Sequence, residues 1–189
     1  MEAKKSGAGH RKYKLCRRIL GNPIVEEDTY CREIKDGKPH GEGEVNGKGE
    51  AEGVGVMVYA NGNMYEGQWR AGEREGVGTF HFATGDKYVG QWVAGQRQGQ
   101  GTFRYADGNR YEGEWVAGKK EGKGTFHYAS GEVEVGRYKA DADVGEGAKW
   151  SADRATAWRL SDGQPGEMIS LEEAARIAER VGPPVPGAS

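Results

Sequence analysis

Tyr65-Glu66-Gly67-Gln68-Trp69 returns 23 residues later at residues 88–92 and again at residues 111–115, with Tyr, Gly and Trp at the same places each time. A Gly-x-Gly motif follows every copy at a constant offset, at residues 76–78, 99–101 and 122–124. A repeat of this length is one supersecondary unit copied along an array. Such arrays usually present binding surfaces, so the repeat favours a binding or scaffolding protein over an enzyme.

The composition is that of one structured domain. The 189 residues are 35% hydrophobic and 30% charged, with 33 glycines, 9 tyrosines and 5 tryptophans. Because the glycines stand at constant offsets from aromatic residues, they indicate an ordered repeat and not a disordered chain. A chain of this length normally forms a single domain.

The two cysteines, Cys16 and Cys31, precede the clear repeats and show no metal-ligand spacing with each other or with a histidine. We expect two free thiols in a reducing compartment and no bound metal or other cofactor. No apolar run approaches the roughly 18 residues that a membrane-spanning helix needs. No continuous apolar segment follows the basic start, as it would in a secretory signal. These features predict a cytoplasmic protein.

Charge is unevenly distributed. Residues 1–18 hold seven cations and one acid, which leaves 20 basic and 28 acidic residues in 19–189. An acidic body argues against nucleic-acid binding, because phosphate neutralisation needs a basic platform. The basic segment is predicted to be a disordered, solvated tail, and its alternative use is to hold a polyanion or an anionic membrane.

The side-chain pattern within one repeat predicts a β-hairpin. Rings and glycines fall on every second position of residues 65–69 and again of 76–82, and period two is the period of a strand. We expect residues 70–75 to connect these two strands and residues 83–86 to turn the chain into the next repeat, with Gly85 at positive φ.

One hairpin alone buries too little to fold, so stacking of hairpins is required. Stacking adds backbone hydrogen bonds between repeats and lets each ring lie over a neighbouring glycine, where a side chain is missing. Each two-stranded unit advances about 10 Å, because strands lie about 4.8 Å apart. The predicted fold is therefore mainly β: an elongated, twisted, single-layer antiparallel sheet of stacked hairpins.

The three copies of Tyr-x-Gly-x-Trp, each followed by Gly-x-Gly-x-Phe, resemble the MORN repeat (membrane occupation and recognition nexus). The resemblance covers about residues 30–149 and weakens at both ends. Upstream, Tyr30 precedes a shortened unit with a hairpin turn expected at Asn46-Gly47. Downstream, Glu134, Gly136 and Tyr138 occupy the Tyr, Gly and Trp positions.

These observations divide the chain into four segments. They are a basic tail (1–18), the repeat array (19–149, with clear copies over 53–131), a hairpin with a capping helix (150–182) and a Pro-rich tail (183–189).

The C-terminal segment is predicted to contain a second kind of hairpin and a helix. Residues 155–160 and 167–169 are expected to pair across the turn at 161–163. Ser170 and Glu173 have capping-box spacing, with Ile169 placed to pack on Ala174. The apolar stripe of the helix consists of Leu171, Ala174, Ala175, Ile177, Ala178 and Val181, and Gly182-Pro183-Pro184 ends it. We expect this helix to cover the terminal ring-bearing face of the array; docking of a partner is its alternative use.

Catalysis finds no support in the sequence. His81 and His127 alternate with the rings and are expected to point to solvent from a strand. No nucleophile elbow, dinucleotide fingerprint or phosphate-binding loop is present. We therefore expect a protein that is not an enzyme.

Two separate surfaces are expected to compete for a binding role. The first is the ring face, where the resemblance implies that a partner helix or peptide docks. The alternative is that these rings only hold the hairpins together. The residues of this face are Tyr65, Trp69, Phe80, Tyr88, Trp92, Phe103, Tyr111, Trp115 and Phe126. The second is a ladder of cations that recur at the repeat period and suit acidic lipid headgroups: Arg74, Arg97 and Lys120, with Lys87 and Arg110. Its neighbours Glu73, Glu75, Asp86 and Glu121 offset much of its charge, which favours solvated loop charges over a lipid-binding site.

The sequence therefore predicts a scaffold that binds a protein partner in a cytoskeletal, ciliary or cortical assembly. The alternative is a peripheral membrane tether that binds acidic phospholipids, such as phosphoinositides, through the basic tail and the cations. Self-association into a homodimer is left open.

Overall fold

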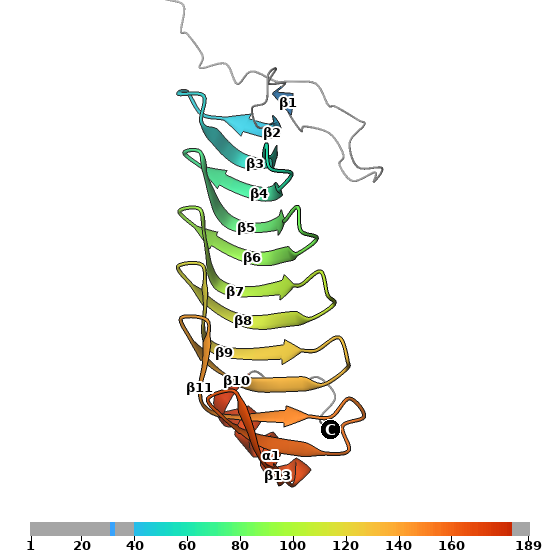
Figure 1. The fold of residues 1–189 in the computed structure, drawn as a ribbon. Helices are drawn as coiled ribbons and strands as arrows, with labels where there is room; N and C mark the ends of the chain where they lie inside the picture. Colours follow the sequence, from blue (N-terminus) through green and yellow to red (C-terminus); the bar gives the residue numbers. More distant parts are fainter. Residues whose placement is uncertain (1–30, 33–39, 183–189) are drawn as a thin grey trace, which may run out of the picture.

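The computed structural model describes residues 31–32 and 40–182, and side chains from residue 43 onward. Within these residues, thirteen strands form one antiparallel sheet in which every strand pairs with its neighbours in the sequence (Figure 1). The strands are β1 Cys31–Arg32, β2 His40–Val45, β3 Ala51–Val58, β4 Met64–Arg70, β5 Glu73–His81, β6 Lys87–Val93, β7 Gln96–Arg104, β8 Arg110–Val116, β9 Lys119–His127, β10 Val133–Lys139, β11 Ala142–Trp150, β12 Ala157–Ser161 and β13 Gln164–Ile169, followed by helix α1 Leu171–Val181. The predicted mainly-β, single-layer array is confirmed.

The connection within each repeat is shorter than predicted. Strand β4 continues to Arg70 and β5 begins at Glu73, so only Ala71 and Gly72 connect them. Both residues have positive φ, 49° and 83°, as a type I′ turn requires. Alanine at the first position hides this turn, because glycine, asparagine or aspartate is usual there. The turn between repeats is as predicted, with Gly85 at φ 94°.

A bulge bends the second strand of each clear repeat, which is β5, β7 or β9. Gly67 pairs with Gly78 but Gln68 pairs with Glu75, so Gly76 and Val77 have no counterpart on β4. Gly76 takes φ 62°, and the Val77 amide donates to Gln68 Oε1 at 2.9 Å. The same shift recurs between β6 and β7 and between β8 and β9. Extra residues in one strand of a pair increase its local twist and bend.

The first described hairpin uses a longer turn than the expected Asn-Gly dipeptide. Asn46 Oδ1 accepts the amides of Lys48 and Glu50, and positive φ occurs at Gly49 and not at Gly47. Several predictions fall outside the described residues: the basic and Pro-rich tails, Cys16, and the degenerate unit around Tyr30. The side chain of Cys31 is also outside them.

The C-terminal hairpin continues the same sheet. Ala157 pairs with Ile169 and Trp158 with Met168 across the turn at Asp162 and Gly163, as expected. Helix α1 is capped by Ser170, whose Oγ accepts the Glu173 amide at 3.1 Å, and it ends before Gly182. Glycine fits this end because a Cβ on it would lie 1.8 Å from a methyl carbon of Val135.

Helix α1 does not cover the ring-bearing face, contrary to the prediction. It packs on β10, β11 and β12 at the end of the array (Figure 1). Its buried residues are Ala174, Ile177, Ala178 and Val181, and they cluster with Val133, Val135, Ala148, Trp150 and Ala157. Val133 and Val135 flank Glu134, which occupies the Tyr position of the ring face, so they lie on the opposite face. We call that opposite face the back face.

The sequence of the last repeat explains why the helix packs there. Four of these sheet positions, on β10 and β11, carry polar or charged residues one repeat earlier: Arg110, Glu112, Thr125 and His127. In the last repeat they become Val133, Val135, Ala148 and Trp150. This part of the back face is therefore apolar enough to bury the helix stripe, whereas the preceding repeat is not.

Candidate partner-binding face

The rings predicted to form a binding face are the hydrophobic core of the array. Tyr65, Tyr88 and Tyr111 are each 0% exposed, and Trp92 is 4% exposed. Phe80 and Phe103 are also buried, whereas Phe126 is half-buried. A single-layer sheet has no second layer, so these rings bury one another and hold successive hairpins together.

Each core tyrosine lies flat over glycines. A Cβ on Gly78 would stand 2.2 Å from the Tyr65 hydroxyl, and one on Gly101 would stand 2.3 Å from the Tyr88 hydroxyl. The Tyr65 hydroxyl donates to the carbonyl of Gln68 at 3.0 Å. The predicted pairing of ring and glycine is confirmed, and burial raises the pKa of Tyr65 and of Tyr88 to about 12.

The tryptophans join one repeat to the next. Trp92 Nε1 donates to the carbonyl of Gly78, in the preceding repeat, at 3.2 Å. Its ring meets Tyr65 edge to face with centroids 5.4 Å apart, and it meets Tyr88 in the same way at 5.2 Å. Such pairs are worth about 0.5–1.5 kcal/mol beyond their buried area.

A second row of rings on this face remains half-buried, and it was not among the predicted site residues. Its members directly follow the ends of β3, β5, β7 and β9 and recur at the 23-residue period: Tyr59, Phe82, Tyr105 and Tyr128. Phe82 lies between Phe80 and Phe103, with centroids 4.6 and 5.5 Å away. The constant spacing is the sequence signal that reveals this row. We call these four residues the outer ring row.

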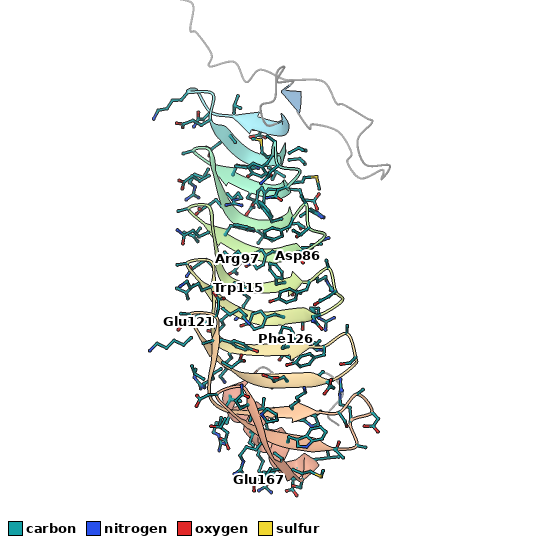
Figure 2. All side chains as sticks on the ribbon, viewed as in Figure 1. Asp86, Arg97, Trp115, Glu121, Phe126 and Glu167 are labelled. Carbon is teal, nitrogen blue, oxygen red and sulfur yellow. The ribbon has the colours of Figure 1, made fainter. Side chains whose placement is uncertain are left out.

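The cations and the rings form one surface, not two. Arg74 Cζ lies 4.4 Å from the Trp92 centroid. Arg97 Cζ lies 4.3 Å from the Trp115 centroid, and Figure 2 shows these two residues close together. Lys120 Nζ lies 4.5 Å from the Tyr138 centroid. Because the ring quadrupole attracts a cation over its face, the core rings position these charges. Arg74, Arg97 and Lys120 are hereafter the cation row.

Lys87 and Arg110 do not belong to this surface. Each directly precedes a core tyrosine on its strand, so its side chain leaves the opposite face of the sheet. Arg110 pairs there with Glu112 at 2.9 Å. The predicted five-membered ladder is therefore split between the two faces, because residues at odd and even positions of a strand point in opposite directions.

The acidic side chains beside the cation row accept hydrogen bonds from backbone amides of neighbouring turns. Glu75 accepts the Ala94 amide at 3.1 Å, Glu121 accepts the Ala140 amide at 2.9 Å, and Asp86 accepts the Ala106 amide at 2.8 Å. These carboxylates satisfy backbone donors of the next repeat. They do not neutralise the cation row by direct contact: among residues 43–182, no carboxylate forms an ion pair with any of its three members.

The cation row is held in place by the following repeat. Arg74 donates to the carbonyl of Gly95 at 2.5 Å, and Arg97 donates in the same way to Gly118. Burial lowers the pKa of Arg97 below its ordinary value. The guanidinium groups therefore have a defined position, with donors left over, because each carries five N–H groups.

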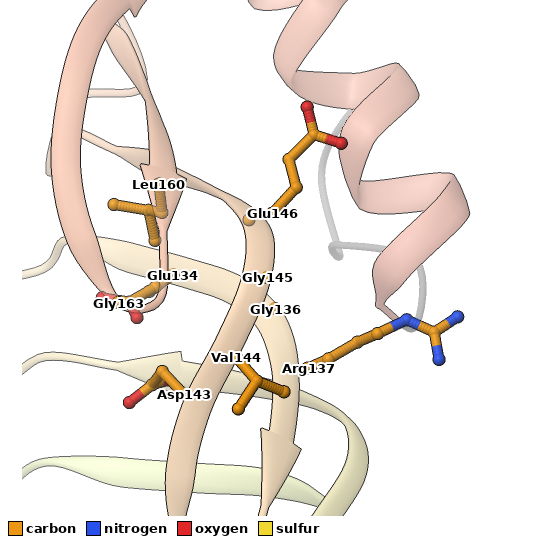
Figure 3. A pocket seen from close by; sticks show the side chains of 10 residues that line it. Glu134, Gly136, Arg137, Asp143, Val144, Gly145, Glu146, Leu160 and Gly163 are labelled. Carbon is orange, nitrogen blue, oxygen red and sulfur yellow. The ribbon is translucent and has the colours of Figure 1, made fainter.

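The ring face changes at its C-terminal end. Glu134 replaces a core tyrosine, is 6% exposed, and accepts the Tyr128 hydroxyl at 2.8 Å. Asp143 stands at the position of the cation row, opposite Tyr138. Without a tyrosine here, a shallow, open depression lies beside Gly136 and Gly145 (Figure 3).

The histidines lie on the back face and are partly shielded by acids. His81 Nε2 lies 3.3 Å from Glu66, and His127 Nε2 lies 3.5 Å from Glu112. Both leave the sheet on the face opposite the rings, as predicted, and their side chains are partly exposed there. Burial and the neighbouring Arg110 lower the pKa of His127. Within residues 31–32 and 40–182 no cluster of metal-ligating side chains occurs, and no helix is long and apolar enough to cross a membrane.

Comparison with known protein families identifies the repeat. The MORN repeat profile matches five times, at residues 33–44, 48–64, 65–87, 88–110 and 111–133, which together are more than half of the chain. The chain belongs to the MORN-repeat family. The resemblance seen in the sequence is confirmed, and the first two matches are shorter than the last three. A search of curated proteins finds no match.

Solved structures show weaker likenesses. The TCP domain of SAS-4 from Drosophila melanogaster, in complex with a proline-rich motif of Ana2, has a TM-score of 0.43 at 16% identity; the alignment covers 81% of this chain and 97% of that one. The G-box domain of the microcephaly protein CPAP has a TM-score of 0.27 at 11% identity, covering 76% of this chain and 99% of that one. TM-scores below 0.5 do not establish a shared fold.

Proposed function

We propose that this MORN-repeat protein is a non-catalytic scaffold that binds a protein partner along its ring face. The observation that supports this most is the outer ring row: four half-buried aromatic side chains at the repeat period, beside three cations that have no ion-pair partner among residues 43–182. Aromatic and arginine side chains dominate the energetics of protein interfaces. The setting we propose is a cytoskeletal, ciliary or cortical assembly.

The ring face is also the face that α1 leaves open. On the back face, α1 already occupies the apolar part of β10, β11 and β12. The ring face runs along every repeat, and no helix or strand among the described residues covers it. Its core rings pack against one another, which makes the surface rigid. A rigid surface loses little conformational entropy when a partner binds.

A peptide-display selection on the full-length chain tests this proposal. Selected peptides should lose binding to the double variant Phe82→Ser, Tyr105→Ser, because both substitutions remove members of the outer ring row without touching a fully buried core ring. The matched control is Val77→Ser, Val93→Ser, which changes two valines that are 60% and 51% exposed on the back face. Equal binding by both variants would contradict a ring-face site, and denaturation curves would verify that both are folded.

The membrane tether is the alternative function, supported by the three cations, which form no ion pair with a carboxylate among residues 43–182. Co-sedimentation with phosphoinositide-containing liposomes at physiological salt tests it, with the parent chain compared with a variant in which Arg74, Arg97 and Lys120 are all changed to Gln. Glutamine is preferable to glutamate here, because a carboxylate placed against the ring faces would destabilise the array. Binding that survives salt and is lost in the triple variant would favour the tether.

A further inference from the structure

The cation row has a polarity along the array. The five positions that share its place in successive repeats hold Ala51, Arg74, Arg97, Lys120 and Asp143. Each of the last four stands opposite a Trp or Tyr of the preceding strand, on the ring face. The charges therefore read neutral, positive, positive, positive, negative in a single line.

The spacing of this line matches an extended peptide of the polyproline II type. Successive members lie on every second strand of the sheet, and neighbouring strands are about 4.8 Å apart, so the members are about 9.6 Å apart. Three residues of a polyproline II helix span about 9.3 Å, and its three residues per turn bring every third side chain to the same side. Every third side chain of such a segment lying along the array would therefore meet one member of the row.

The charges of the row are available to such a segment. Arg74, Arg97 and Lys120 form no ion pair among residues 43–182, whereas Arg110 and Lys149 each pair with a glutamate. Rings and turn carbonyls fix the two guanidinium groups, so a carboxylate would meet donors that are already positioned. The outer ring row runs parallel to them and would contact the intervening side chains.

We propose that the ring face recognises an extended acidic segment of a partner protein, with carboxylates at every third residue and a basic residue three positions beyond the last of them. The three carboxylates pair with Arg74, Arg97 and Lys120, and the basic residue pairs with Asp143. This inference rests on the proposed function, because it names the chemistry of the partner that occupies the same face.

A peptide fits this pattern better than an anionic bilayer does. A membrane surface presents negative charge everywhere, including opposite Asp143, and residues 19–189 carry 20 basic and 28 acidic groups. A peptide can place its own cation over Asp143 and so complement both signs. Charge complementarity of this kind fixes register and excludes wrong partners.

The experiment is a fluorescence titration of the full-length chain with synthetic peptides. The test peptide has glutamates at three positions spaced by three and a lysine three positions later, with proline and leucine between them. A peptide of the same composition with its charges clustered is the control. We expect the test peptide to bind at least about fivefold more tightly, which corresponds to about 1 kcal/mol.

Two substitutions locate the contact. Arg97→Gln should weaken the test peptide about fivefold, and Arg104→Gln, on the exposed back face, should not change it. Asp143→Lys should invert the preference at the last position, so that a peptide with glutamate in place of its lysine becomes the tighter ligand. A gain of binding cannot come from unfolding, so this variant separates recognition from stability.

The outcomes distinguish this inference from the proposed function. If the clustered peptide binds as well as the spaced one, or Asp143→Lys inverts nothing, the spacing rule is wrong. If display-selected peptides bind the ring face but carry no such acidic pattern, the proposed function stands and this inference falls. If only phosphoinositide vesicles bind, and Arg97→Gln abolishes that binding, both are overturned in favour of the tether.

Discussion

Arg74 lies over Trp92, a residue of the following repeat, with its guanidinium carbon 4.4 Å from the centroid of the indole ring. It also donates to the carbonyl of Gly95, in the turn of that same repeat. One side chain thus links the core, the turn and the open surface of adjacent hairpins. The ring face is a structural interface between repeats and, on its outer side, the surface that we propose for binding.

Replacement of a core tryptophan should test stability and not binding. We expect Trp92→Ala to lower the free energy of unfolding by about 3–5 kcal/mol, because it removes a ring that is 4% exposed together with the bond to Gly78. Urea denaturation followed by circular dichroism measures this. Val93→Ala is the control: Val93 is 51% exposed, and its loss should cost less than about 0.5 kcal/mol. A loss below about 1 kcal/mol for Trp92→Ala would contradict the core assignment.

Glycines under the tyrosines should not tolerate a methyl group. Gly78→Ala places a Cβ 2.2 Å from the Tyr65 hydroxyl and 2.5 Å from Cζ of that ring. We expect a loss of about 1–3 kcal/mol, as for other overpacked cores. Thermal denaturation measures it, with Gly47→Ala as the control, because nothing lies within 4 Å of a Cβ at Gly47. Equal melting temperatures for the two variants would show that the tyrosines do not lie on the glycines.

The buried carboxyl of Glu134 should make stability depend on pH. Burial raises its pKa above the ordinary value of 4.5, so the folded protein holds this proton more tightly than the unfolded chain. Its contribution to the free energy of unfolding is therefore most favourable below pH 4.5 and declines as the pH rises through the folded pKa. We expect Glu134→Gln to be more stable than the parent above this range and similar to it below pH 4.5.

Glu132 gives a control of opposite sign. Hydrogen bonds from Ser130 and Lys149 lower its pKa, so its contribution is present above pH 4.5 and is lost as the pH falls through the folded pKa. Glu132→Gln should therefore be less stable than the parent at neutral pH. Guanidinium denaturation across the acidic and neutral range would measure both variants, and parallel curves for the two would refute the difference in burial.

Helix α1 should stabilise only its own end of the array. Repeats contact their neighbours alone, so loss of the helix contact should propagate weakly. Ile177→Asp places a charge at a site that is 2% exposed and should increase amide exchange over residues 157–181 while residues 64–104 stay protected. Leu171→Asp, on the same helix at 47% exposure, should leave the exchange pattern unchanged. Deprotection of the whole sheet by Ile177→Asp would show that the helix stabilises every repeat.

The repeat period made most of the fold predictable. Strand identity, antiparallel stacking, the turns around Gly85 and the packing of Tyr65 on glycine all follow from alternation and constant offsets. The two-residue turn at Ala71-Gly72 was not predicted, since alanine rarely takes positive φ and the tertiary structure overrides that preference. The bulge at Gly76 was not predicted either, because a Gly-x-Gly motif is compatible with a regular strand.

The candidate site was predicted less completely, for a physical reason. Period two assigns each residue to one of two faces, and this correctly placed the core rings. It did not show that Arg74 and Arg97 bend over those rings. Strand alternation gives the face from which a side chain leaves the sheet, but it does not say where the end of a long side chain lies on that face. The half-buried outer ring row follows the same period but stands just beyond the strands, and so was missed.

The sequence by itself determined the repeat unit, which is a two-stranded hairpin, and the number of its copies in the clear part of the array. It also determined the direction of stacking. These features depend on the local spacing of residues and on backbone pairing. Only the tertiary structure decided which surfaces remain available. It placed α1 on the back face, where Val133 and Val135 replace polar residues, and it joined cations and rings into one surface. Exposure is a property of the whole packed array, and a residue's own neighbours in the chain do not set it.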